Sequence, residues 1–364
     1  MKIWGGLSIY LGTQFLKNVG IILAVIISII FLIDFIELLR RGSGKEGVTF
    51  LITLQMVLLR LPELTQTLLP FIALFGGMLT FFRLSRTSEL TVIRAAGVSV
   101  WQFLLPSLLI AFLIGVFVLT VLNPIAATMK AHYEQMEARL FKKQTNLLMV
   151  SSKDLWLRQV DEKGLSVIHA RGILNKGIDL TEVIIFQYDK KDQFTGRIEA
   201  DRARLRKGYW ELDGVLMTSP DQPGIVQKHL KLQTSLTVNQ IQESFAAPNT
   251  LSFWDLPGFI DTLEEAGFSA LRHRLYWHSL IAGPVLLLAM VLVAATFSLR
   301  ATRSGHTSLL VMAGITTGFV FYFFSDIILA LGMSGGLPVA LAAWTPAITI
   351  TLFGLSMMFH LEDG

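Results

Sequence analysis

The sequence predicts an integral membrane protein with six transmembrane helices and one inserted water-soluble β domain. Its mean hydropathy is +0.57 and only 16% of its residues are charged, which is too apolar for a soluble protein of 364 residues. The apolar residues form long runs near both ends, and a middle third of ordinary polarity separates these runs. The chain therefore divides into 1–130 with three helices, 131–268 with the β domain and a connector, and 269–364 with three more helices.

A helix that crosses a bilayer needs about 20 apolar residues. The segments that meet this length are 17–39, 62–82, 100–122, 277–299, 307–331 and 337–359. The apolar stretch 48–61 precedes Pro62, and we expect it to form the interfacial start of the second helix, with a bend at that proline. The first apolar run is longer than a signal-peptide core and no small-residue cleavage site follows it, which predicts a retained helix.

Lysines and arginines in the short connections set the predicted orientation, because they accumulate on the cytoplasmic side of a membrane. One side carries Lys2, Lys17, Arg83, Arg86, Arg94, Arg300 and Arg303. The other side carries Arg40, Arg41 and Lys45, and an uncharged loop at 332–336. Both termini are therefore predicted in the cytoplasm and the β domain outside it, which means the periplasm in a Gram-negative cell.

The middle of the chain changes to the alternating pattern of β-strands. The segments with this pattern are 154–160, 165–172, 180–189, 196–205, 209–219 and 226–238. Turn-forming residues separate them at Lys163-Gly164, Lys176-Gly177, Lys191-Asp192, Lys207-Gly208 and 221–224. Short strands at this spacing predict an antiparallel sandwich, barrel or jelly roll. The following segment, 252–266, has the periodicity of an amphipathic helix, which we expect at the membrane surface before the fourth span.

The sequence predicts neither a catalytic site nor a metal site. The fragment Gly42 to Glu46, GSGKE, resembles part of a phosphate-binding loop, but Leu39 stands at the first glycine position and Glu46 replaces the magnesium-binding hydroxyl. The seven histidines have no metal-ligand spacing, and the chain has no cysteine. We therefore expect a subunit that is not an enzyme, holds no cofactor and binds no nucleic acid.

Several ionisable residues fall within or beside the predicted spans, where they are costly and usually face a cavity or a partner. Asp34, Glu37 and Arg41 share one face of the first helix. Two roles are open for Arg40 and Arg41: pairing and snorkelling at the interface, or binding an anion. In the fifth span, Asp326 follows Gly314 and Gly318, which form a G-x-x-x-G surface suited to close helix packing and able to sit tightly against another subunit.

A short charged segment, RLSRTSELTVIRAAGVS, connects the second and third spans on the predicted cytoplasmic side. It predicts a helix over about 85–97, with Ser88 as its N-cap and Gly97 as its C-terminal stop. An ion pair between Arg86 and Glu89 is the simplest structural role for its charges. The mixed apolar and acidic surface instead favours a knob that fits a cleft in another protein.

The stretch from Leu68 to Ser99, above all SELTVIRAAG, resembles the lipopolysaccharide-export permease family of LptF/LptG-type ABC transporter subunits. The layout of three spans, a β domain and three spans is also similar, and GFVFYFFSDI at 318–327 is closer to the LptG-type branch. The resemblance implies six transmembrane helices plus a periplasmic β-jelly-roll domain in the Gram-negative inner membrane. It implies a permease that extracts lipopolysaccharide from the outer leaflet and passes it to a periplasmic bridge.

The same resemblance implies the partners: a sister LptF-type permease, a cytoplasmic ATPase dimer that binds ATP and Mg²⁺, a bitopic LptC-type accessory protein and a periplasmic LptA-type bridge. Its implied ATPase-coupling residues are Arg86, Glu89, Leu90, Ile93 and Arg94. Its implied lipid-binding residues are Arg40 and Arg41, to which we add Asp34, Glu37, Arg60, Lys130 and Arg139. Asp34 and Glu63 stand where several family members carry lysine. Gly314, Gly318 and Asp326 are assigned to packing and gating, since the family's gates involve the first and fifth helices.

Two other functions remain as alternatives. An ion-coupled secondary carrier would use Asp34, Glu37 and Asp326, although the two halves of the chain have no inverted repeat. A membrane scaffold or sensor that transports nothing is the third possibility.

Overall fold

The computed structural model describes residues 2–43, 47–141, 148–150, 155–161, 164–174, 179–189, 193–220, 222–234, 247–265, 269–304 and 307–362. They form two compact units. The transmembrane unit contains residues 1–133 and 275–364, and the β unit contains residues 134–274. The domain boundaries at 130/131 and 268/269 remain predictions from the sequence.

All described secondary-structure elements of the transmembrane unit are helices. Its elements are α1 Lys2–Gly42, α2 Phe50–Arg86, α3 Glu89–Ala95, α4 Val100–Phe117, the π-helix η1 Val118–Leu122, α5 Asn123–Phe141, α8 Leu271–Ser304, α9 Thr307–Met333 and α10 Val339–Glu362. Within the described part of the chain, six helical spans are long and apolar enough to cross a membrane, which confirms the predicted number. The third of them is the continuous run Val100–Phe141, which is longer than the predicted 100–122.

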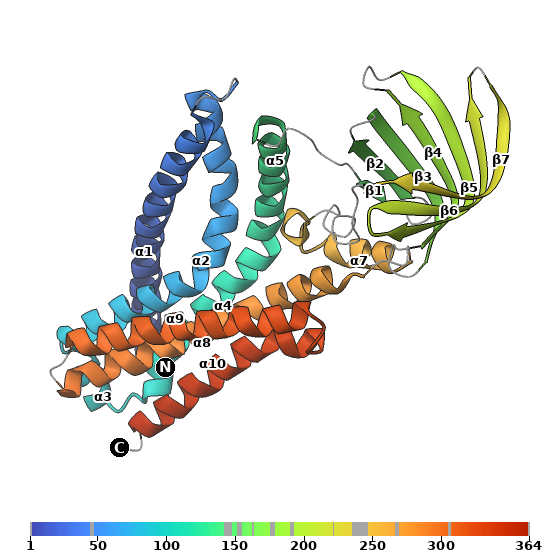
Figure 1. Ribbon diagram of the computed structural model, residues 1–364. Helices are drawn as coiled ribbons and strands as arrows, with labels where there is room; N and C mark the ends of the chain where they lie inside the picture. The colour runs from blue at the N-terminus through green and yellow to red at the C-terminus, as the bar shows by residue number, and fades with distance from the viewer. Residues whose placement is uncertain are drawn as a thin grey trace. The chain divides into compact units, whose positions relative to one another are not determined.

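The helix that forms the second span, α2, begins before the predicted span 62–82. Thr49 caps α2, because its hydroxyl accepts a hydrogen bond from the backbone N–H of Ile52 at 3.4 Å. The helix then runs through both Pro62 and Pro70. Figure 1 shows α2 changing direction along its length, as expected where prolines remove backbone hydrogen bonds. The stretch 48–61 therefore belongs largely to this helix, as predicted.

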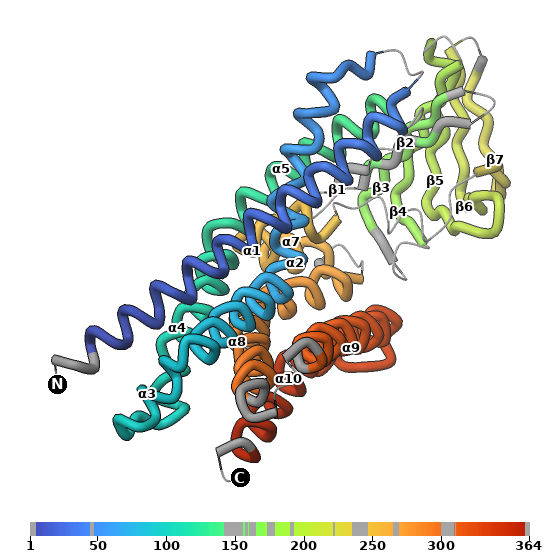
Figure 2. Tube along the Cα trace, turned by 90° about the vertical axis from the view of Figure 1, so that its left-hand side faces the viewer, coloured from blue at the N-terminus to red at the C-terminus, as the bar shows by residue number. Residues whose placement is uncertain are grey.

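Helices α2 and α8 form the centre of the transmembrane unit. In the most apolar window of each, 61% of the residues are buried, whereas the corresponding fraction in α1 and α9 is 11%. Small residues bring the central helices together: a methyl group added at Gly77 would lie 2.9 Å from the Ala294 Cβ atom of α8. Helix α1 lies alongside α2 in both views (Figures 1 and 2). Because most of α1 and α9 is exposed in this chain, their apolar surfaces face the bilayer or another subunit.

The β unit is one antiparallel sheet with the strand order of the sequence. Its strands are β1 Leu148–Val150, β2 Leu155–Asp161, β3 Gly164–Leu174, β4 Asp179–Tyr188, β5 Phe194–Arg206, β6 Tyr209–Ser219 and β7 Gln222–Gln233. The predicted insertion of a β domain is confirmed. Each described strand pairs with its neighbour in the chain, so the described strands form an up-and-down sheet.

One turn prediction in the β unit is wrong. Gln222 already pairs with Ser219, so the expected turn at 221–224 is shorter and Pro223 lies inside β7. Proline is tolerated there because β7 is an edge strand among those described. The turn at Lys207-Gly208 is confirmed, with a φ of +84° at the glycine. The turns predicted at Lys163, 176–177 and 191–192, and the end of the last strand at 235–238, lie outside the described residues.

Alternating side chains of the central strands build the core of the β unit. Ile185, Ile198 and Leu212 are each at most 2% exposed, and the Trp210 side chain is buried among the largest core residues. Helix α7, Leu256–Glu265, follows the sheet. Its Leu256, Ile260 and Leu263 are buried, which confirms the predicted apolar face of the connector.

Candidate functional site

An ion pair joins helices α1 and α2 of the transmembrane unit. Arg60 of α2 donates from Nη1 to Oδ1 of Asp34 in α1 at 2.5 Å. The Asp34 side chain is only 7% exposed, and that of Arg60 is 29% exposed. An unpaired carboxylate at this level of burial would be very costly. Arg60 therefore compensates the charge of Asp34 in this span.

A second ion pair lies beside the first. Lys130 Nζ of α5 lies 2.7 Å from Glu63 Oε2 of α2. The buried ring of Tyr133 links the two pairs, because the Arg60 Cζ atom lies 5.7 Å and the Lys130 Nζ atom 5.4 Å from its centroid. We call these five residues the charged cluster. Its two acids and two bases give it no formal net charge, and it ties α1, α2 and α5 together.

The charged cluster changes how the predicted lipid-binding residues are understood. Asp34, Arg60 and Lys130 lie together, but the two cations are engaged by carboxylates of the same chain. Glu63 and Tyr133 complete the cluster and were not among the predicted site residues. The spacing of Arg60 with Glu63 and of Lys130 with Tyr133, both at i, i+3, was the available sequence signal.

The other predicted lipid-binding residues lie elsewhere. Arg40 and Arg41 occupy the last turn of α1, where cations suit the partial negative charge of the helix end, and both are exposed. Glu37 is exposed on the same helix. Arg139 is exposed on the part of α5 that belongs to the β unit. Arg40 takes part in none of the ion pairs between described residues.

The segment between α2 and α4 forms the short helix α3, whose C-terminus has the predicted glycine stop. Gly97 has a φ of +82°, and its N–H donates to the carbonyl of Arg94 at 3.0 Å. The Val98 N–H donates to the Ile93 carbonyl at 3.3 Å, which completes a Schellman motif. The helix spans seven residues and is shorter than the predicted 85–97.

The N-terminus of α3 differs from the prediction. Ser88 occupies the N-cap position, but its φ of 60° is left-handed and its side chain makes no capping hydrogen bond. The ion pair between Arg86 and Glu89, the simpler alternative considered for these charges, is absent among the described residues. Instead, Tyr10 Oη of α1 donates to Glu89 Oε2 at 2.9 Å, and Thr87 Oγ1 donates to Glu89 Oε1 at 2.9 Å. Glu89 therefore links α3 directly to α1.

The two faces of α3 have different environments. Leu90 is 8% exposed and Ile93 is partly buried, and both pack against the transmembrane core. Val92 is 68% exposed, and Arg86 and Arg94 are also exposed. Leu90 and Ile93 are thus apolar anchors, whereas Arg86 and Arg94 face outward together with the apolar Val92.

The glycines of the fifth span pack within the chain. A methyl group added at Gly314 would lie 2.7 Å from Met78 Cε, and one at Gly318 would lie 2.5 Å from Leu74 Cδ2. Both neighbours belong to α2. The G-x-x-x-G surface therefore fixes α9 on its own α2 and is not free for another subunit. Asp326 lies on the exposed part of α9.

Six candidate membrane-spanning helices in the described residues, an inserted β sheet and a short helix between the second and third spans define a multi-pass membrane protein. The described residues contain no group of three or more side chains that would hold a metal ion. The chain belongs to the lipopolysaccharide export system permease LptF/LptG family, whose model matches residues 9–360.

Two curated relatives match the chain over nearly its full length. The chain is 25% identical over 377 residues to the lipopolysaccharide export system permease protein LptG of Escherichia coli strain K12, and the match covers 99% of each chain. It is 23% identical over 356 residues to the LptG protein of Haemophilus influenzae, with 93% of this chain and 94% of the relative covered.

Proposed function

We propose that this chain is the LptG-type permease subunit of a lipopolysaccharide exporter in the inner membrane of a Gram-negative cell. It extracts lipopolysaccharide from the outer leaflet and passes it to a periplasmic bridge toward the outer membrane. The family match over residues 9–360 supports this function. The structural observation that carries it is the long unburied face of α1: none of the residues 20–33, all of which are described, is buried.

A sister permease covers the exposed faces of α1 and α9. These faces carry large apolar side chains, including Val25, Ile29 and Ile33 on α1 and Val320, Phe323 and Ile327 on α9. Each of these side chains is at least 50% exposed. The two helices that are least buried in this chain thus line a cavity shared with the second subunit, where lipid enters laterally.

A separate cytoplasmic ATPase dimer supplies the energy and binds ATP with Mg²⁺. Helix α3 is its docking element, with Arg86, Val92 and Arg94 facing outward and Leu90 and Ile93 anchoring the helix to the core. This assignment places both termini and α3 in the cytoplasm and the β unit in the periplasm. The excess of lysine and arginine near α3 supports that orientation.

The β unit passes the lipid onward. β7 is an edge strand among those described, and its Val226 side chain is 79% exposed. An exposed edge accepts a strand from another protein by backbone hydrogen bonding. A bitopic accessory protein and the periplasmic bridge attach in this way.

Arg40 and Arg41 contact the lipid phosphates, because guanidinium groups bind phosphate through paired hydrogen bonds. Changing both arginines to aspartate is expected to weaken photocrosslinking of lipopolysaccharide to the chain. A matched change of the exposed Arg206 and Arg171 in the β unit controls for net charge. Undiminished crosslinking in the Arg40 and Arg41 variant would exclude these contacts.

The decisive experiment is co-purification of the tagged chain followed by lipid release from proteoliposomes. Wild type is expected to bring down an ATPase and a sister permease and to release lipopolysaccharide only with ATP. Glu89→Ala should lose the ATPase or its transport coupling, whereas Thr91→Ala, at an exposed position on the same helix, should behave like wild type. Release driven by a proton gradient without ATP would instead identify a secondary carrier.

A further inference from the structure

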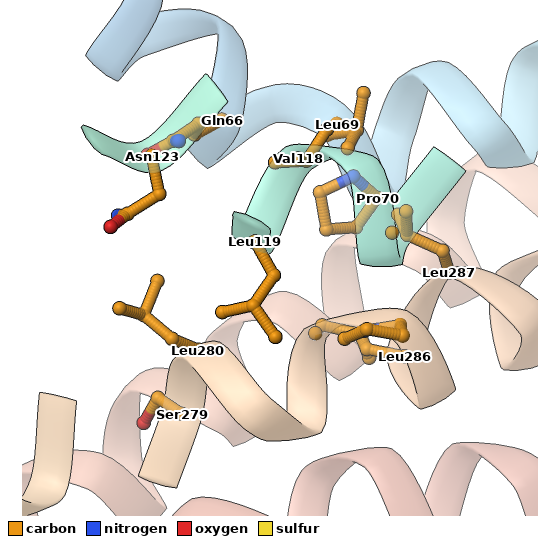
Figure 3. A pocket seen from close by; sticks show the side chains of 13 residues that line it. Gln66, Leu69, Pro70, Val118, Leu119, Asn123, Ser279, Leu280, Leu286 and Leu287 are labelled. Atoms are coloured by element: carbon orange, nitrogen blue, oxygen red, sulfur yellow. The ribbon is translucent and has the colours of Figure 1, made fainter. Parts of the chain in front are cut away.

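A cavity of about 180 Å³ lies inside the transmembrane unit, between α2, α8 and the π-helix η1. Figure 3 shows Leu119 of η1 reaching across the space toward α8, with Pro70 and Leu286 among the other lining residues. The wall is mostly apolar. The volume is comparable with that of an engineered apolar cavity of about 150 Å³ that takes up benzene.

The helices separate here for a local reason. The π-helix η1 interrupts the regular winding between α4 and α5, and such interruptions often mark functional sites. On one side Gly115 touches α8 so closely that an added methyl group would lie 2.5 Å from the Pro284 Cα atom. A methyl group added at the adjacent Gly283, by contrast, would meet no atom within 4 Å. The open space therefore begins directly beside a tight helix contact.

One polar group on the wall lacks a partner. Asn123 hydrogen-bonds the Tyr276 hydroxyl, and Ser279 donates to the Leu275 carbonyl at 2.8 Å. Gln66 Nε2, however, is buried and has no hydrogen-bond partner in the described part of the chain. An unpaired amide N–H in a membrane interior is costly, so this position calls for an acceptor from outside the chain.

The order of groups along α2 indicates which acceptor fits. Arg60 and Glu63 of the charged cluster come first, Gln66 follows about 4.5 Å further along the helix, and Leu69 and Pro70 line the apolar space beyond it. A glycerophospholipid has the same order: a charged head, ester carbonyls and acyl chains. The absence of net charge in the cluster favours a zwitterionic head over one with several phosphates.

We propose that this cavity holds part of one acyl chain of a bilayer glycerophospholipid, with Gln66 Nε2 donating to the ester carbonyl at the head of that chain. Hydrocarbon tails are as apolar as leucine side chains. The acyl chain therefore gains no hydrophobic free energy when it moves from the bilayer into the cavity. It is held because it fills a void and satisfies the amide. The lipid is a fixed component of one permease subunit and not its cargo, and the site does not depend on the proposed export function.

Filling the cavity tests the site directly. The full-length chain with its co-purifying subunits is analysed by native mass spectrometry after detergent exchange, and wild type is expected to retain one phosphatidylethanolamine molecule. Gly283→Phe occupies the open space and should abolish retention. Gly283→Ala is the matched control, since it removes the same glycine from the helix but leaves most of the volume empty, and it should retain the lipid.

Removing the donor provides a second measurement that does not rely on a large side chain. Gln66→Leu should lower retention about fivefold, the effect of losing one hydrogen bond. Phosphatidylethanolamine with a diazirine in its acyl chain should crosslink wild type at residues 279–287 of α8. A wild-type protein without bound phospholipid, lipopolysaccharide as the retained molecule, or equal retention and crosslinking in Gly283→Phe would each overturn the proposal.

Discussion

The ion pair between Asp34 and Arg60 should contribute far more to stability than an exposed ion pair of similar length. Two unit charges about 4 Å apart attract each other by about 4 kcal/mol at an effective dielectric constant of about 20. Desolvation opposes this attraction, and the second carboxylate oxygen of Asp34 has no hydrogen-bond partner among the described residues. Because Arg60 is 29% exposed and keeps part of its hydration, we expect a net coupling of about 2 kcal/mol.

A double-mutant cycle measures this coupling. Asp34→Ala, Arg60→Ala and the double variant are compared with wild type by thermal unfolding in one detergent, followed by tryptophan fluorescence. For a chain of this size a change of 1 kcal/mol shifts the apparent Tm by about 2 °C. Each single variant should therefore lower it by about 4 °C, and the double variant by little more, because it leaves no unpaired charge.

The pair Arg274–Glu264 in the β unit is the matched control. Its N···O distance is 2.7 Å, but the two side chains are 51% and 39% exposed. An exposed pair of this kind contributes about 0.5 kcal/mol. Equal coupling energies in the two cycles would refute the reasoning that burial, and not distance, sets the strength of the Asp34–Arg60 pair.

Three further changes test individual contacts. Tyr10→Phe removes the donor to Glu89. We expect transport per ATP hydrolysed to fall about two- to fivefold while the amount of co-purified ATPase stays constant. A loss of ATPase binding would contradict this role. Gly97→Ala forces a Cβ atom into a backbone with a φ of +82° and should lower stability by about 1 kcal/mol, whereas Gly5→Ala, at an open helical position, should not lower the Tm. Gly318→Leu overpacks the contact with Leu74 and should cost about 1–3 kcal/mol in the same unfolding assay, and an unchanged Tm would mean that α9 is not fixed on α2.

Hydropathy and periodicity predicted most of the fold. The six spans follow from the length that a helix needs to cross hydrocarbon, and β2 to β6 follow from strict alternation. β1 was missed because three residues carry too little pattern. The turn at 221–224 was wrong because proline and glycine signal a turn by composition, while an edge strand tolerates both.

The site was less predictable because its contacts join distant parts of the chain. Asp34 and Arg60 are 26 residues apart, and Tyr10 and Glu89 are 79 residues apart. The sequence identified Asp34 and Glu89 as unusual, since charged residues in or beside a span need a partner. It does not state which helix provides that partner. The cavity beside Gln66 could not be predicted from the sequence for the same reason, because its walls come from three separate segments.

Helix α1 is held in this chain by buried packing at Leu11, Phe15 and Val19 and by polar contacts at Tyr10 and Asp34, and this arrangement predicts how it moves. Tyr10 and Asp34 are about 36 Å apart along the helix, and residues 20–33 between them include no buried side chain. The segment 20–33 is therefore only partly packed against the core, while Glu89 and Arg60 bind Tyr10 and Asp34 on either side of it. Substitutions so far apart normally act additively. If α1 moves as one rigid body between α3 and the charged cluster, Tyr10→Phe and Asp34→Asn will instead be non-additive in transport rate, whereas additive effects would show that the two ends act independently.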